Sequence, residues 1–135
     1  MSKSVYRFNF YQSNQFLENR IEERGFDSDE VFEQLKDCIS YDLEIDGNLQ
    51  EIILVDENQL QLIVSILEDC EIKFIYQDIT TDVLHSRLSF DDDDFQEQID
   101  DFVKNNLTLD LILDKINLYG VKSLTDFEKS FLKLF

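Results

Sequence analysis

The order of strand and helix patterns along this chain of 135 residues predicts an α+β fold with a ferredoxin-like sheet. Three observations support this prediction. Alternating apolar and polar residues begin the chain and helical stripes follow. A second alternating run precedes the turn signal Asp46-Gly47-Asn48, and a return strand follows it. The predicted order is strand, helices, strand, strand, helix, strand. We therefore expect a four-stranded antiparallel sheet with helices on one face, followed by a C-terminal helical hairpin.

The first strand is predicted from Val5 to Tyr11, because Tyr6, Phe8 and Phe10 fall on one face of an extended chain. Ser13 or Asn14 can then cap a helix that ends before Gly25. A second helix is predicted to begin at the pair Asp27 and Glu30, whose spacing resembles a capping box.

Tyr41, Leu43 and Ile45 alternate with three acidic residues, which indicates a strand whose acidic side meets water. A return strand is predicted from Leu49 to Val55 after the hairpin turn. The region from Asn58 to Cys70 has the apolar stripe of a well-covered helix, and residues 72–79 read as the fourth strand.

The C-terminal region carries several helix-start signals after an ambiguous stretch at residues 80–89. The run Asp91 to Asp94 supplies capping carboxylates, Thr108 restarts a helix that Gly120 ends, and Thr125 with Glu128 forms a capping box for a last helix. The predicted organisation is a ferredoxin-like domain at residues 1–80, an acidic connector at 81–94, and a helical appendage at 95–135 packed on the same domain.

Residues 108–134 also carry a resemblance. The segment Ile112-Leu113-Asp114-Lys115-Ile116, then Gly120, Ser123-Leu124-Thr125, Glu128 and Phe131-Leu132 resembles a short helix-turn-helix tail. This tail recurs at the C-termini of otherwise unrelated bacterial proteins, among them rhomboid-type membrane proteins. The resemblance implies a bacterial origin and a small helical hairpin, and it implies no activity.

The net charge of −18 is concentrated in two stretches of the chain. Residues 26–71 contain 14 carboxylates against Lys36 alone, and residues 91–101 contain seven carboxylates and no base. Such segregated charge favours a basic partner and repels nucleic acid and anionic membranes. A surface that serves only solubility is the alternative explanation.

The sequence contains no pattern typical of an enzyme or of a cofactor site. His85 is the only histidine, no glycine-rich phosphate loop is present, and the consecutive acids at 91–94 lack the spacing and glycine of a calcium loop. Cys38 and Cys70 lie in apolar helical patterns, which suits reduced, buried thiols. We expect no catalysis, no metal and no cofactor, and a cytoplasmic location.

The predicted function is therefore that of a non-catalytic acidic protein. It would occlude a basic surface on a protein partner as an inhibitor, immunity-type protein or adaptor, with nucleic-acid mimicry as one form of this recognition. The alternative is a regulatory module that binds a small molecule as a dimer, and either a monomer or a homodimer is compatible with the sequence. The candidate partner-binding residues are Asp29, Glu33, Asp37, Asp42, Glu44, Asp46, Asp91, Asp92, Asp93 and Asp94.

Overall fold

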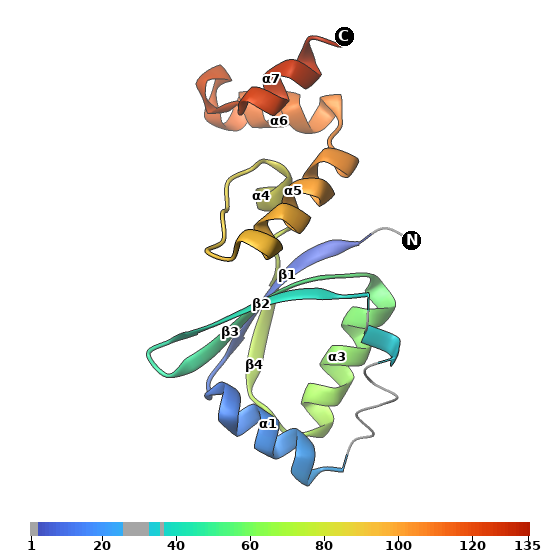
Figure 1. Cartoon of the computed structure of the whole chain (residues 1–135), viewed down its shortest axis with the longest axis vertical. Helices are drawn as coiled ribbons and strands as arrows, with labels where there is room; N and C mark the ends of the chain where they lie inside the picture. The colour runs from blue at the N-terminus through green and yellow to red at the C-terminus, as the bar shows by residue number, and fades with distance from the viewer. Residues whose placement is uncertain (1–2, 26–32, 36) are drawn as a thin grey trace. The chain divides into compact units, whose positions relative to one another are not determined.

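The computed structural model describes residues 3–25, 33–35 and 37–135 (Figure 1). The chain divides into two compact units, Met1–Ile79 and Thr80–Phe135. Each unit has its own arrangement of elements and is described by itself.

The first unit is a four-stranded antiparallel sheet with helices on one face (Figure 1). Its elements are β1 (Ser4–Phe10), α1 (Asn14–Glu23), β2 (Ile39–Ile45), β3 (Asn48–Val55), α3 (Glu57–Asp69) and β4 (Phe74–Asp78). The strands lie in the order β2-β3-β1-β4, so that β2 and β4 are the two edges. This order and the alternation of strands and helices confirm the predicted ferredoxin-like α+β fold.

The core of the first unit lies between the sheet and the helices α1 and α3. Tyr6, Phe8 and Phe10 of β1 pack there with Leu17 of α1 and with Leu60 and Leu67 of α3. Phe8 also stacks on two residues of β4, with ring centroids 5.9 Å from Phe74 and 5.2 Å from Tyr76. The alternation at the start of the chain therefore has the predicted cause, because every second residue of β1 belongs to this core.

Local side-chain contacts fix where these elements begin. The Ser13 hydroxyl accepts a hydrogen bond from the Phe16 amide at the start of α1, and Asp56 forms a capping box with Gln59 at the start of α3. Between β2 and β3, Asp46 and Gly47 have φ angles of 53° and 81°. Two successive positive φ angles are typical of a type I′ turn, which sets the register of the hairpin.

The second unit is helical. It contains α4 (Thr80–Leu84), α5 (Asp93–Asn106), α6 (Leu109–Tyr119), the short 3-10 helix η1 (Val121–Ser123) and α7 (Asp126–Leu132). Leu107, Ile112 and Leu124 are buried together, and Phe131 and Leu132 of α7 pack against them. The predicted starts at Thr108 and Thr125 are confirmed, because both hydroxyls accept amide hydrogen bonds from the first turn of their helices. In the part of the chain that the structure describes, no helix combines the length and apolar character needed to cross a membrane.

Candidate partner-binding surface

Two of the predicted contact residues lie side by side on the edge strand β2. In the β2–β3 pairing, Asp42 is opposite Glu51 and Glu44 is opposite Leu49. In the β1–β3 pairing, Glu51 is in turn opposite Phe8, a core residue beneath the helices. Asp42 and Glu44 therefore project from the helix-bearing side of the sheet, at its outer edge, and both are exposed.

Glu51 is a carboxyl group that the sequence analysis did not single out. It lies half-buried on β3 and forms a hydrogen bond with the carboxyl group of its cross-strand neighbour Asp42. Burial, this hydrogen bond and the negative charge of Asp42 raise the pKa of Glu51 from 4.5 to about 8. At neutral pH the pair therefore shares one proton and carries a single negative charge.

Glu44 is held in place by the neighbouring helix. Its Oε1 atom accepts a hydrogen bond of 3.1 Å from the backbone amide of Asn14, the first residue of α1. The Leu49 amide on the adjacent strand donates to the carbonyl oxygen of Gln12, at 2.8 Å. A carboxylate at a helix N-terminus is favoured by the helix dipole, so the start of α1 holds Glu44 in position at the surface.

The segment before β2 extends this acidic edge. Asp37 is exposed, and its backbone carbonyl accepts a hydrogen bond of 3.0 Å from the Lys3 ammonium group. Burial raises the pKa of the neighbouring Cys38 thiol; Lys3 opposes this rise, and Asp56, Asp37 and Glu51 add to it. Cys38 is half-buried and lies just before β2, not in the helix that the sequence predicted for it. Its raised pKa favours the protonated thiol, which is a weak nucleophile.

The remaining predicted residues of the first unit have different positions. Glu33 is exposed in a helical stretch at residues 33–35, and Asp46 is exposed in the hairpin turn. Asp29 lies outside the described residues. We call the group of Asp37, Asp42, Glu44 and Asp46 the β2 acidic edge.

The aspartate run belongs to the second unit and has a clear structural role. The Asp92 side chain accepts a hydrogen bond of 2.9 Å from the Phe95 amide and caps α5, while Asp93 and Asp94 lie in the first turn. All four aspartates from 91 to 94 are exposed. The cap accounts for Asp92, and the helix dipole favours the two aspartates that follow it.

The arginines of α1 pair with acids outside the β2 acidic edge. Among the described residues, Arg20 lies 4.0 Å from Glu23, and Arg24 at the C-terminal end of α1 lies 3.1 Å from Glu71. Asp42, Glu44 and Asp46 form no ion pair with the lysines and arginines in residues 3–25, 33–35 and 37–135. Nor do any three histidine, cysteine or acidic side chains within these ranges converge to hold a metal ion.

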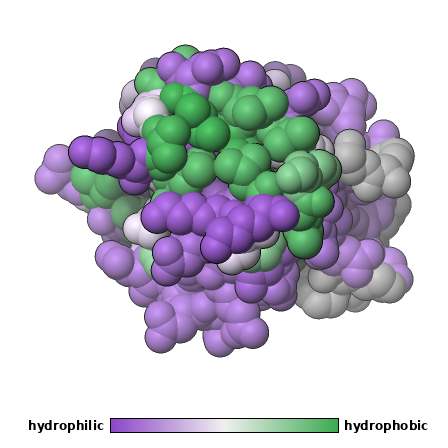
Figure 2. All heavy atoms as spheres, turned by 90° about the horizontal axis from the view of Figure 1, so that it is seen from above, coloured by the Kyte–Doolittle hydropathy of each residue, from purple (hydrophilic) through white to green (hydrophobic). Residues whose placement is uncertain are grey.

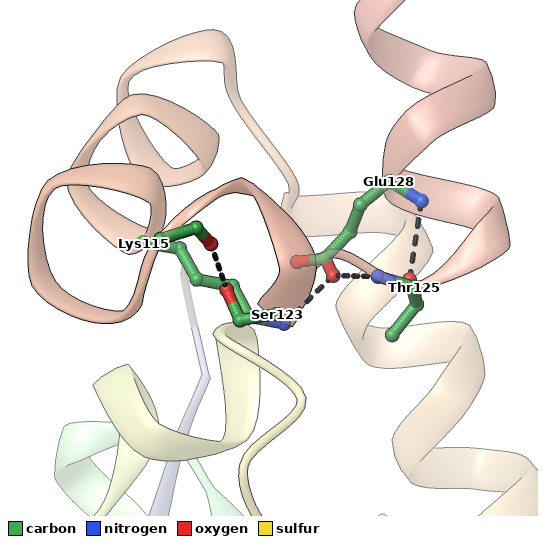
Figure 3. A network of polar contacts seen from close by, with 5 residues as sticks. Lys115, Ser123, Thr125 and Glu128 are labelled. Atoms are coloured by element: carbon green, nitrogen blue, oxygen red, sulfur yellow. Dashed lines mark hydrogen bonds and ion pairs between the residues drawn. The ribbon is translucent and has the colours of Figure 1, made fainter.

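A buried ion pair in the C-terminal hairpin was also not predicted (Figure 3). The Lys115 ammonium group of α6 lies 2.7 Å from Oε1 of Glu128 on α7, and both side chains are almost completely buried. The same oxygen accepts the Thr125 amide at 2.7 Å, completing the capping box. The sequence indicated the cap, but the helical spacing of Lys115 gave no indication that its charge is buried against α7.

No protein-family model matches this chain, and the searches of curated proteins and of solved structures also found no match.

Proposed function

We propose that the first unit binds a basic protein surface through the β2 acidic edge and thereby occludes that surface. One observation carries the proposal: Asp42 and Glu44 are exposed neighbours on one side of an edge strand, with no arginine or lysine of the described chain paired to them. Residues two apart on a strand are separated by about 6.6 Å. Two lysine or arginine side chains of a partner can therefore each meet one carboxylate.

The Asp42–Glu51 pair couples the proposed binding to the release of a proton. A cation placed next to Asp42 lowers the proton affinity of Glu51, because it compensates the negative charge that raises the pKa of this group. Binding then releases the shared proton and adds Glu51 as a third carboxylate to the contact. The proposed complex therefore becomes tighter as the pH rises through 7 toward 8.

The test is affinity capture at low salt, followed by elution with a salt gradient and identification of the eluted proteins. The double variant Asp42→Asn with Glu44→Gln removes both charges but keeps their size, and the glutamine oxygen still accepts the Asn14 amide. The control is Glu68→Gln with Asp69→Asn, which removes two exposed charges from the end of α3.

We expect the β2 variant to lose the captured basic protein, while the α3 control retains it. Equal loss from both variants indicates that capture depends on net charge alone, which contradicts a specific docking surface. If the β2 variant still captures the basic protein, the β2 acidic edge is not the docking surface.

A small-molecule module is the second candidate function, and one feature of the first unit favours it. The edge strand β4 borders a hollow of about 570 Å³. Its lining combines apolar and aromatic residues, among them Phe74, Ile75 and Tyr76, with the charged residues Glu68 and Lys73. A thermal-shift screen with a metabolite panel tests this alternative. A ligand that raises the melting temperature of the natural chain but not of an Ile75→Glu variant favours the module.

A further inference from the structure

The C-terminal segment from α6 to the end of the chain exposes several large apolar side chains (Figure 2). Leu118 is 65% exposed, Val121 62%, Leu134 78% and Phe135 72%. Figure 2 shows hydrophobic atoms gathered into a continuous area on the face seen from above, where Figure 1 draws α6 and α7. Scattered exposed leucines are ordinary, whereas a continuous apolar area is typical of an interaction surface.

This segment lies outside the two acidic stretches of the chain and carries no net charge. Residues 107–135 contain four acidic residues and four lysines, so the whole net charge of −18 resides elsewhere. Lys115 and Glu128 also neutralise each other inside the hairpin. A second, equally acidic copy therefore meets little electrostatic repulsion at this segment.

The exposed charges on the two helices are complementary. On α6, the exposed Asp110 and Asp114 lie at helical spacing from the exposed Leu113 and Leu118. At the end of α7, the exposed Lys129 and Lys133 accompany Leu134 and Phe135. A two-fold axis that places α6 of one copy against α7 of its partner pairs the two aspartates of α6 with the two lysines at the end of α7. Leu113 and Leu118 are five residues apart, about 140° around an ideal helix, so they lie on either side of the aspartate row.

We propose that this face of the second unit is a homodimer interface, in which α6 of each copy packs against α7 of the other. The face is self-complementary, as an isologous contact requires. The dimer presents two β2 acidic edges at once, so a partner with two basic sites is bound more tightly than by one copy.

Sedimentation equilibrium at physiological ionic strength tests the interface. The average mass of the natural chain should rise above its monomer mass of 16.1 kDa as its concentration increases to about 0.5 mM, where about 40% of the chains are dimeric even at a Kd of about 1 mM. Leu118→Asp should weaken the dimer at least tenfold without unfolding the chain, because the side chain is already largely exposed. Ile45→Asp is the control, since it adds the same charge at an exposed apolar residue of β2.

A pair of charge variants tests the complementarity directly. Lys129→Glu with Lys133→Glu makes the charges of both helices acidic, whereas Asp110→Lys with Asp114→Lys makes them basic. Each variant alone should be monomeric, and an equimolar mixture should form heterodimers.

Three results overturn the proposal: a natural chain that stays monomeric, a Leu118→Asp variant that dimerises normally, or charge variants that do not associate when mixed. A monomer that instead binds phosphatidylglycerol vesicles, and loses this binding on Leu118→Asp, assigns the same face to a membrane surface.

Discussion

Replacing Glu51 by glutamine should change how the stability of this protein depends on pH. Glutamine keeps the size of the side chain and can still form a hydrogen bond with Asp42, but it does not ionise. In the natural chain, folding raises the pKa of Glu51 from 4.5 to about 8. Between these two values the folded chain holds a proton that the unfolded chain has released, so stability falls as the pH rises.

The size of the effect follows from the same values. One pKa unit corresponds to about 1.4 kcal/mol, so a change from 4.5 to about 8 corresponds to a maximum of about 5 kcal/mol. Half-burial of Glu51 and relaxation around Asp42 reduce this maximum. Below pH 4.5 the contribution is fully present, and above pH 8 it has been lost.

Urea unfolding at pH 5, 6, 7 and 8 measures this contribution as a difference between two proteins. The free energy of unfolding of the natural chain should fall relative to that of Glu51→Gln at each step, and the two curves should become parallel above pH 8. Other carboxylates titrate in both proteins and cancel in the difference. Glu22→Gln, which changes an exposed residue of α1, is the matched control and should parallel the natural chain throughout.

Parallel curves for the natural chain and Glu51→Gln between pH 5 and 8 would refute the shared proton. The variant Asp42→Asn separates the effect of burial on the pKa of Glu51 from the effect of the Asp42 charge. Burial is the largest cause of the raised pKa of Glu51, so removing Asp42 should reduce the pH dependence without abolishing it.

Three further predictions follow from other parts of the structure. Raising sodium chloride from about 10 to 200 mM should raise the melting temperature by a few degrees, because screening reduces repulsion among the acids; a flat or falling melting curve contradicts this. Lys115→Met should destabilise the second unit by about 3 to 5 kcal/mol, measured by circular dichroism, because it leaves Glu128 charged and buried; adding Glu128→Gln should recover part of the loss. His85→Phe should unfold at an equal or higher temperature, because both ring nitrogens of this buried histidine lack a hydrogen-bond partner among the described residues, while the edge contact with Tyr119 is kept; a clear loss of stability would show that the nitrogens are satisfied.

Local patterns were sufficient to predict most of the fold. The alternation in β1, the turn at Asp46-Gly47 and the capping residues Ser13 and Thr125 all have their predicted structural roles. These signals depend on residues close in sequence, where backbone geometry and one hydrogen bond decide the outcome. The short helix α4 was missed because its five residues carry too few apolar positions to define a stripe.

The site was only partly predictable. Asp42 and Glu44 were selected as solvent-facing, and both are exposed. The pairing of Asp42 with Glu51 was available in principle, because a two-residue turn fixes which residues of the two strands are opposite each other. Two features depend on tertiary packing, and no local pattern predicts them. They are the burial of Glu51 on the helix side of the sheet and the contact between Lys115 of α6 and Glu128 of α7.

The energetics of the β2 acidic edge link its stability to its proposed role. Two carboxyl groups directly opposite each other on paired strands destabilise the folded chain. A lysine or threonine opposite Asp42 would remove the repulsion. The fold tolerates the pair only by retaining a proton on Glu51 at neutral pH. A basic side chain from a partner would replace that proton and relieve the same repulsion. The free energy that this arrangement costs the isolated chain is then recovered in the complex, which is the relation expected where local rules of stability are broken at a functional surface.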